Sequence, residues 1–457
     1  MPDYLTFAGM AESTVPVGTI MLFLPIQIYR ENFEMSDEVA RVATCPIHEI
    51  VPMHPDILKS PWGMNRRLRE EAPVFKDPLT GIFFVSRYED VVKLSMDHET
   101  FSSKMLSANR ALAATEDEEI KKIMEKGYPN VDTMLTQDPP LQRRYRKFVD
   151  GAFSPSSLKA LEPYIEQLSH DLIDKFIDKG ECDFLAEFGV ALPLTVIVDQ
   201  LGAPQEDIPL FRKWVEAFIG NLSQQLDRDG LLKAAESMVE FQHYFVARMN
   251  ERRREPQDDI LSKIVNARFD GEQPLEDPEC LSMISQILVA GNETTSATLT
   301  EGIWLLINNP DQYELIKNDP SPEMISRFVE EILRISSPSS NMFRRTTRDV
   351  EMHGVTILEN SIVFARFASA NQDADRFPEP EKMNIMRDNL KEQVAFGKGV
   401  HHCLGAALSR REMNIGFKVI FERLENFRLA TGASDPEYSA NALLHGLTGL
   451  NLAFDKR

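Results

Sequence analysis

Cys403 lies in a glycine-rich stretch, AFGKGVHHCLGAALSRREM, which spans residues 395–413. Apolar residues at helical spacing follow the cysteine and predict a helix over residues 404–424. Cys403 is therefore expected at a helix N-terminus, where unpaired backbone N–H groups and the helix dipole favour a thiolate. Glycines on both sides of the cysteine leave room for a loop and a helix start to press against a large flat ligand.

Three roles for this thiol are open from the residue types alone: an inert buried cysteine, a catalytic nucleophile and an axial metal ligand. A nucleophile needs a positioned base, and His401 and His402 do not reliably face the sulfur at such close sequence spacing. A zinc site needs further Cys or His ligands at regular spacing, for which Cys45-x-x-His48 gives only weak support.

A second group of polar residues interrupts a long apolar helix. Asp277-Pro278-Glu279 supplies start signals and Asn309-Pro310 a stop signal, which together predict a helix of about 30 residues. AGNETT, residues 290–295, lies in its middle between two apolar flanks. Burying Glu293 and two threonines there is costly without partners. Alternatively, Glu293 lies on a solvated stripe and the Thr294 hydroxyl bonds back to a carbonyl four residues earlier.

The composition predicts a globular protein without nucleic-acid partners. The 457 residues are 43% hydrophobic and 26% charged, which suffices for a large core. The balance of 50 Lys and Arg against 71 Asp and Glu gives a formal net charge of −21, which repels phosphates and anionic lipid surfaces. The four cysteines include no CxxC pair, so we expect no disulfide framework and a cytoplasmic location.

The first 60 residues are expected to form an N-terminal extension packed on a single domain that covers residues 61–457. Val15–Tyr29 is uncharged, but it contains two prolines and is shorter than the roughly 20 apolar residues that span a bilayer. Acidic Asp3 and Glu12 precede it, where a signal peptide carries positive charge. We therefore expect no membrane anchor, with a weak membrane-surface contact as the alternative.

Helix predominates in the hydrophobic pattern, with short strands between the helices. Runs around Val74 and over Ile82–Val85 predict a hairpin, and residues 350–365 predict a second strand pair. A helix from Leu161 is expected to end near a C-cap at Gly180. The other predicted helices cover residues 186–201, 206–222, 230–254, 278–308, 322–336 and 404–424.

The stretch Phe396–Gly405, FGKGVHHCLG, matches the FGxGxHxCxG haem-binding motif of the cytochrome P-450 superfamily at every specified position, and the chain resembles that family. The resemblance makes Cys403 the proximal thiolate ligand of the haem iron and gives His401 a hydrogen bond to a haem propionate. It also implies that Phe396 packs beside the sulfur and that Gly397 and Gly405 lie against the haem.

Two further motifs follow the order of the family. EILR, Glu331–Arg334, resembles the ExxR pair of the helix that supports the cysteine loop. AGNETT resembles the oxygen-activating motif, in which Glu293 is the acid, Thr294 is the alcohol, and Ala290 and Gly291 lie against the haem.

Three segments resemble other parts of the haem site. Residues 138–155, DPPLQRRYRKFVDGAFSP, resemble a helix on the proximal side of the haem, with Arg146 as a propionate ligand and Gln142 where many relatives carry histidine. FRRTTRDVEMHGVTI resembles the strand pair that carries another propionate-binding arginine, which would be Arg345. In the segment before the cysteine loop, Lys382-Met383 stands where the family has Arg-Phe.

The resemblance implies a mainly α fold of the cytochrome P-450 type, with a long central helix, small β-sheets and haem b sandwiched between helices. A thiolate axial ligand favours O–O bond cleavage, so the implied activity is a monooxygenase that activates O2 and hydroxylates a hydrophobic small molecule: a terpenoid, steroid, fatty acid or aromatic compound. Electrons from NAD(P)H would arrive through a separate ferredoxin and its reductase, and the protein would be a monomer.

Two other activities are weighed against this one. A non-catalytic haem sensor or carrier needs no proton relay, so the Glu293-Thr294 pair counts against it. A peroxide-driven peroxygenase usually carries a basic residue in place of the relay acid, and Glu293 is acidic.

The resemblance also suggests two surfaces around the haem. The expected apolar wall comprises Leu288, Ala290, residues 105–135, Met342, Phe343 and Leu447. A basic patch on the proximal face, expected to dock an acidic ferredoxin, comprises Arg143, Arg144, Lys147, Lys398, Arg410 and Arg411.

Overall fold

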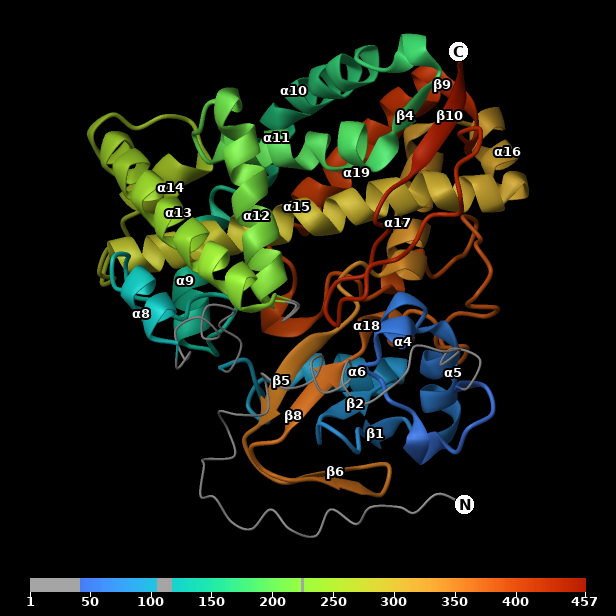
Figure 1. The fold of residues 1–457 in the computed structure, drawn as a ribbon, viewed down its shortest axis with the longest axis horizontal. Helices are drawn as coiled ribbons and strands as arrows, with labels where there is room; N and C mark the ends of the chain where they lie inside the picture. Colours follow the sequence, from blue (N-terminus) through green and yellow to red (C-terminus); the bar gives the residue numbers. More distant parts are fainter. Residues whose placement is uncertain (1–41, 105–116, 223–225) are drawn as a thin grey trace.

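A computed structural model describes residues 42–104, 117–222 and 226–457, and most of its elements are helices (Figure 1). Small strands lie mainly on one side of the helical part. The helices are α4 (Pro55–Lys59), α5 (Trp62–Glu71), α6 (Tyr88–Met96), α8 (Glu118–Met124), α9 (Leu141–Asp150), α10 (Pro155–Asp174), α11 (Ala191–Gln200), α12 (Ile208–Leu222), α13 (Arg228–Arg254), α14 (Ile260–Asn266), α15 (Asp277–Asn308), α16 (Pro310–Asn318), α17 (Pro322–Ser336), α18 (Phe367–Ala370) and α19 (Ala406–Arg423).

The strands form three small sheets. Their orders are β1-β2-β8-β5-β3, β4-β10-β9 and β6-β7. The strands are β1 (Val74–Lys76), β2 (Phe83–Val85), β3 (Phe101–Ser102), β4 (Glu181–Asp183), β5 (Met342–Thr346), β6 (Val350–Met352), β7 (Val355–Ile357), β8 (Ile362–Ala365), β9 (Leu424–Leu429) and β10 (Asn451–Lys456).

The central helix α15 crosses the molecule, as the sequence predicts (Figure 1). Its 32 residues give a length of about 48 Å. The start is fixed by a capping box between Glu276 and Glu279 and by Pro278 in the first turn, and the helix ends at Asn309 before Pro310. Local capping signals in the sequence therefore predicted both ends of α15.

The two halves of α15 pack in different hydrophobic clusters. Its first half, through Leu288, packs with α12, α13 and α14. Its second half, from Leu299, packs with α10, α17 and α19. AGNETT lies between the residues of α15 that enter these two clusters.

The five-stranded sheet joins the beginning of the domain to its last third. The predicted hairpin is the antiparallel pair β1-β2, and β2 pairs in parallel with β8. The predicted strand pair within 350–365 is the antiparallel pair β6-β7, followed by β8. Residues 42–60 contribute Val42, Ile50 and Ile57 to the cluster that packs on this sheet. Residues 1–41 of the predicted extension lie outside the described part.

Three helix boundaries differ from the sequence prediction. The helix α10 begins at Pro155 and not at Leu161, because the Ser154 hydroxyl accepts a hydrogen bond from the Ser157 N–H at 3.3 Å and caps the helix earlier. Gly180, with φ +72°, ends a 3-10 turn that follows α10. The predicted helix 186–201 is a π-helical segment followed by α11.

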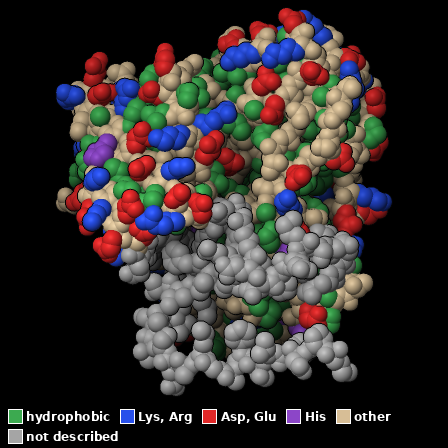
Figure 2. Space-filling model, viewed as in Figure 1, with side chains coloured by type: hydrophobic (Ala, Val, Ile, Leu, Met, Phe, Trp, Pro, Cys, Tyr) green, Lys and Arg blue, Asp and Glu red, His purple; other side chains and the backbone are tan. Residues whose placement is uncertain are grey.

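Charge is mixed on the surface. On the face in Figure 2, basic and acidic side chains are interspersed, so the net charge of −21 does not collect in one acidic patch there. Among the described residues, no helix is both long enough and apolar enough to span a bilayer.

Candidate active site

A cavity lies between the middle of α15 and the cysteine loop, residues 395–405, and it collects most of the predicted site residues. Its predicted lining residues are Arg146, Ala290, Gly291, Thr294, Phe396, Gly397, His401, Cys403 and Gly405. Its wall is otherwise largely apolar and includes Met134, Leu135, Phe153, Ile197, Ile287, Leu333, Met342 and Leu408. Three predicted residues, Gln142, Glu293 and Arg345, are absent from the lining.

The cysteine loop is a tight turn held by its own backbone. The Cys403 N–H donates to the Phe396 carbonyl at 2.9 Å, and the Gly397 N–H donates to the Val394 carbonyl at 2.8 Å. Gly399 has φ +72°, and a β-carbon there would lie 2.5 Å from the backbone oxygen of Ser95. Only glycine allows this left-handed conformation and the close approach of α6.

The Cys403 thiol lies just before α19, but its electrostatics differ from the sequence expectation. Burial raises the pKa of Cys403, and the N–H groups of Gly405 and Ala406 only partly oppose this effect. The position at a helix N-terminus predicts a lowered pKa for this thiol, and this prediction is wrong because it neglects desolvation. A metal cation on the sulfur would supply the missing charge, since a coordinating thiol is deprotonated outright.

The geometry does not support the two alternative cysteine sites, a catalytic nucleophile at Cys403 and a zinc site at Cys45 and His48. Among the described residues, no hydrogen bond joins the Cys403 sulfur to His401 or His402, so the nucleophile lacks its base. Within that same part of the chain, no group of three or more His, Cys, Asp or Glu side chains is arranged to hold a bare metal ion, Cys45 and His48 included.

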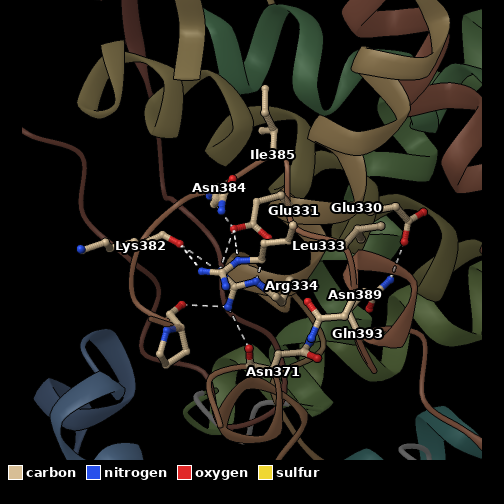
Figure 3. A network of polar contacts seen from close by, with 12 residues as sticks. Glu330, Glu331, Leu333, Arg334, Asn371, Lys382, Asn384, Ile385, Asn389 and Gln393 are labelled. Atoms are coloured by element: carbon tan, nitrogen blue, oxygen red, sulfur yellow. Dashed lines mark hydrogen bonds and ion pairs between the residues drawn. The ribbon is translucent and has the colours of Figure 1, made fainter. Parts of the chain in front are cut away.

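The ExxR pair forms a fully buried network behind the cysteine loop (Figure 3). The Arg334 guanidinium contacts both carboxylate oxygens of Glu331, at 2.7 and 2.9 Å. It also donates to the carbonyls of Asn371, Pro380 and Lys382. One planar cation thus joins α17 to two turns of the segment that leads to the cysteine loop.

Asn371 carries this network to the cysteine loop. Its side-chain oxygen accepts a hydrogen bond from the Val394 N–H at 2.7 Å, and its amide donates to the Ser337 hydroxyl at 2.8 Å. The backbone carbonyl of the same residue accepts from Arg334. The position of the loop is therefore coupled to the buried ion pair.

Arg387 completes the network. The sequence analysis did not identify this arginine, because Lys382-Met383 stands where the family has Arg-Phe. The Arg387 Nε lies 3.1 Å from the Glu331 Oε1. Its other nitrogens donate to the carbonyls of Pro378, Glu379 and Lys382. The missing arginine is thus supplied four residues beyond Met383, and no local pattern marks it.

A second clamp lies beside the first. Arg410 on α19 pairs with Glu330 on α17 at 2.5 Å, and its guanidinium stacks on the Phe396 ring at 4.4 Å. The Gln393 amide donates to Glu330, as Figure 3 shows, and its oxygen accepts from the Ala395 N–H. Arg410, which the sequence analysis places in the basic patch, thus also holds the cysteine loop.

The cavity contains a neutral donor, His401, and a buried cation, Arg344, that forms no ion pair among the described residues, which fits a ligand with anionic groups. The His401 Nε2 is buried and has no hydrogen-bond partner. Burial, followed by the positive charge of Arg344, lowers the pKa of His401 to about 4. Burial likewise lowers the pKa of Arg344 to about 10, although Asp138 opposes this effect. Anionic propionates would satisfy these donors, so the residues fit a haem bound through Cys403.

Arg344, and not the predicted Arg345, lines this cavity. Side chains alternate between the two faces of a strand. On β5, Met342 and Arg344 face the cavity, whereas Phe343 packs on Phe364 with ring centroids 4.2 Å apart. Arg345 shares the face of Phe343, so counting one residue too far selects the wrong side of the sheet.

Arg146 and Gln142 on α9 hold the cysteine loop from its other side. The Gln142 Nε2 donates to the Val400 carbonyl at 2.6 Å, and the Arg146 Nη1 donates to the His402 carbonyl at 3.0 Å. Gln142 therefore orients the loop from outside the cavity, whereas Arg146 also reaches the cavity lining.

The polar residues of α15 divide between two surroundings. The Thr294 hydroxyl lines the cavity and donates to the Ala290 carbonyl at 3.0 Å, which is the back-bond anticipated from the sequence. Thr295 bonds instead to the Ser409 hydroxyl at 2.9 Å. Glu293 lies outside the cavity lining, and burial and the nearby Glu216 raise the pKa of its carboxyl.

The predicted apolar wall is partly correct. Ala290, Leu135 and Met342 line the cavity. Leu288 is buried in the core, and Phe343 and Leu447 are absent from the lining. Residues 105–116 of the predicted wall lie outside the described part. Sequence reasoning missed Arg344, Arg387 and Glu412, and Glu412 gave no signal because it follows two arginines in a helix of mixed polar and apolar residues.

Comparisons with known proteins agree with this geometry. The cytochrome P450 family model matches residues 197–448. A steroid C26-monooxygenase of Mycobacterium tuberculosis is 31% identical, over 85% of this chain and 92% of the relative. A vitamin D(3) 25-hydroxylase of Pseudonocardia autotrophica is 32% identical, over 87% and 95%. The solved structure of cytochrome P450 CYP109Q5 from Chondromyces apiculatus has a TM-score of 0.78 and 30% identity, covering 90% of this chain and all of that one.

The family model and the buried thiol point to one conclusion. The match spans more than half of the chain, the two relatives align over most of their own lengths, and Cys403 occupies the cavity beside an unpaired histidine and a buried arginine. The chain belongs to the cytochrome P450 family and is a haem-dependent monooxygenase.

Proposed function

We propose that this monooxygenase hydroxylates a hydrophobic, steroid-sized or smaller molecule with electrons delivered by a separate acidic ferredoxin. The observation that carries the proposal is the composition of the cavity: apolar side chains surround a buried thiol and the hydroxyls of Thr294, Thr295 and Thr298. The named activities of the two relatives, on a steroid and on vitamin D3, support the substrate class.

The haem would be held by residues on both sides of the cavity. Cys403 would bind the iron, and His401, Arg344 and Arg146 would bind the propionates. A haem with a thiolate ligand supplies O–O bond cleavage when it is bound. Arg344 replaces Arg345 in this assignment.

Thr294 and Glu293 are assigned to proton handling. Thr294 offers its hydroxyl to dioxygen that enters the cavity, while the Ala290 carbonyl fixes the direction of that hydroxyl. Glu293 faces Glu216 on α12, and we assign it to proton exchange on that side of α15. This pair counts against a haem sensor, and the acid counts against a peroxygenase.

Replacing Thr294 with alanine is expected to uncouple the enzyme. Haem content and substrate affinity stay unchanged, but product formed per NAD(P)H consumed falls by about tenfold or more, because a positioned hydroxyl is lost. The missing reducing equivalents appear as hydrogen peroxide. Thr295→Ala is the matched control, since that hydroxyl is engaged by Ser409. A well-coupled Thr294→Ala variant, or an uncoupled Thr295→Ala variant, would assign the role to the wrong threonine.

Substrate entry is expected to be visible in the absorption spectrum. A panel of steroids, secosteroids, terpenoids and fatty acids is titrated for the low-to-high spin change. Met342→Ala should weaken the tightest ligand by about tenfold, since it forfeits about 1.5 kcal/mol of apolar burial. Phe343→Leu, one residue along on the opposite face of β5, should leave affinity unchanged. A panel without any spin change contradicts the proposed substrate class.

Fewer basic side chains are available for ferredoxin docking than the six that the sequence analysis predicts. Arg144 pairs with Glu279 at 3.0 Å, and Arg411 pairs with Glu162 at 3.1 Å. Arg143 and Lys147 on α9 are exposed. They line a groove together with Gln142, Arg146, Asp150 and Val400. A second groove, beside Cys403, is lined by basic and acidic side chains, among them Arg410, Arg411, Lys418, Glu162 and Glu422. We assign ferredoxin docking to this groove and to the exposed edge of α9.

Reversing the charge of Arg143 to glutamate is expected to slow reduction by an acidic ferredoxin at low salt. The difference from wild type should shrink as ionic strength rises, because the Debye length is about 10 Å at 0.1 M. Arg66→Glu, an exposed site on α5, is the control and should not change the rate. Equal low-salt reduction rates for Arg143→Glu and wild type, measured by stopped flow, would refute this docking surface.

A further inference from the structure

Glu301 on α15 is a buried acid that does not belong to the cavity lining. Its side chain is 1% exposed, and its Oε1 accepts a hydrogen bond from the Tyr438 hydroxyl at 3.0 Å. Among the described residues, its Oε2 has no hydrogen-bond partner, and the buried Ser336 hydroxyl on α17 also lacks one. Glu301 is therefore held by a single phenol, whereas the buried Glu330 and Glu331 are held by arginines.

Burial dominates the electrostatics of this carboxyl. It raises the pKa of Glu301 to about 7, although the hydroxyls of Tyr438 and Ser336 lower it. Burial, followed by the charge of Glu301, raises the pKa of Tyr438, so the phenol keeps its proton. Glu301 therefore changes between a neutral acid and a buried carboxylate near neutral pH.

The groups that face Glu301 from the neighbouring elements are uncharged near neutral pH. Tyr438 belongs to the C-terminal hairpin, residues 437–448, and Ser336 belongs to α17. The His445 ring of the hairpin stacks on the Tyr438 ring with centroids 4.4 Å apart, and burial lowers the pKa of His445 to about 4. No charged group of α17, α19 or β9 affects the pKa of Glu301.

The C-terminal hairpin packs directly on α15. The Ser439 N–H donates to the Gly446 carbonyl at 3.0 Å and holds the two arms of the hairpin together. A β-carbon on Gly446 would lie 2.8 Å from the β-carbon of Ala297, which is one helical turn before Glu301. Backbone packing and the hydrogen bond from Tyr438 thus hold the hairpin at neighbouring turns of the helix.

The tip of the hairpin is joined to the wall of the cavity. The His445 N–H donates to the Pro338 carbonyl at 2.9 Å, and the Ser340 N–H donates to the Leu443 carbonyl at 2.9 Å. Pro338 and Ser339 line the cavity. A displacement of the hairpin would therefore displace this part of the wall.

We propose that Glu301 and Tyr438 form a proton-dependent clamp, which positions the C-terminal hairpin and, through it, the Pro338-Ser339 wall of the substrate cavity. The hairpin is closed on α15 while Glu301 is protonated. Ionisation places a carboxylate without a cationic partner in the interior, and opening of the hairpin relieves this cost by admitting water. The clamp is independent of the substrate class, but its effect on substrate binding rests on the proposed function.

The direction of the pH effect follows from the two environments of Glu301. Opening exposes the carboxyl to water, where its pKa returns toward the ordinary value of 4.5. The closed state therefore holds the proton more tightly than the open state, and rising pH favours opening until the pH exceeds both pKa values. Between pH 6 and pH 8 the opening constant should rise about tenfold, and at higher pH it should level off.

The first test is amide hydrogen exchange in the haem-loaded protein, corrected for the intrinsic pH dependence of exchange. The hairpin amides of Ser439 and His445 should show the rise of about tenfold between pH 6 and pH 8. Glu301→Gln still accepts from Tyr438 but cannot ionise, so it should remove this rise. Glu437→Gln is the matched control and should keep it, since Glu437 is an exposed acid of the same hairpin. A wild-type hairpin without the rise, or a Glu301→Gln hairpin that keeps it, refutes the clamp.

Tyr438→Phe gives an independent test, which also serves if Glu301→Gln does not fold. The phenol lowers the pKa of Glu301, so its removal should raise that pKa. The pH at which hairpin exchange levels off should therefore move upward from the wild-type value. A levelling-off pH that is unchanged or lower would overturn the proposal.

Ligand binding separates the clamp from the proposed function. Saturating progesterone should slow hairpin exchange in the wild type, because a ligand that binds the closed wall opposes opening. If progesterone changes the spin state but leaves hairpin exchange unchanged, the hairpin does not position the wall and the proposal is wrong. If no steroid changes the spin state and the hairpin still opens with rising pH through Glu301, the clamp stands and the proposed substrate class fails.

Discussion

Replacing Cys403 with histidine is expected to abolish the red-shifted absorption band that the reduced carbon monoxide complex of a thiolate-ligated haem shows. The wild-type chain should carry non-covalent haem b and show this band in full. Histidine can still ligate iron, but it lacks the electron donation of a thiolate, so monooxygenase activity should be lost even where haem is retained. The measurement is the reduced difference spectrum, with haem content determined in parallel.

Cys280 provides the control for this substitution. It is a buried free cysteine on α15, outside the cavity lining, and burial raises the pKa of its thiol to about 12. Cys280→Ala should keep the thiolate band and the activity. A Cys403→His or Cys403→Ser variant with an unchanged spectrum would show that another residue binds the iron.

The second large effect is expected from the buried ExxR network. Arg334→Ala leaves the Glu331 carboxylate in a fully buried position with only Arg387 as a charged partner. Breaking a buried ion pair from one side destabilises a protein by about 3–5 kcal/mol, a large part of the roughly 5–15 kcal/mol that holds a native domain together. We expect little folded protein and little haem retention.

Arg334→Lys should fare little better, because one ammonium cannot reproduce a planar fork that meets Glu331 and three carbonyls. The readouts are the denaturation midpoint and the fraction of protein with the thiolate band. Lys382→Ala is the control from the same network. Its carbonyl accepts from Arg334, but its side chain is exposed and pairs only with Glu379. Equal midpoints for Arg334→Ala and Lys382→Ala would show that the network does not support the fold.

Ion pairs explain why the proximal surface carries less free positive charge than its number of arginines suggests. Arg144, Arg410 and Arg411 are each paired with an acid from another helix. These acids partly offset the charges of the three arginines, which also stabilise contacts between elements. Arg143 is exposed and forms no ion pair among the described residues, so its charge reversal tests partner docking without breaking such a contact.

Local sequence patterns determined the long helix and the cysteine loop. The ends of α15 follow from a capping box, a first-turn proline and the stop at Asn309-Pro310, all of which act within one helical turn. The motif around Cys403 predicted that its thiol binds the haem iron, and the glycines of the motif allow the turn that the structure shows. Such features depend on neighbours along the chain, so the sequence by itself specifies them.

The remaining assignments depended on residues far apart in the chain. Only the pairing of β5 with β8 shows that Arg344 faces the cavity and Arg345 does not. Only the packed fold brings Arg387 to Glu331, a contact over 56 residues of sequence. Burial likewise shifts the pKa values of buried groups: it raises the pKa of Cys403 against the helix dipole and raises the pKa of Glu412 well above its ordinary value. Desolvation and the choice of partner are properties of the surrounding atoms, which only the tertiary structure supplies.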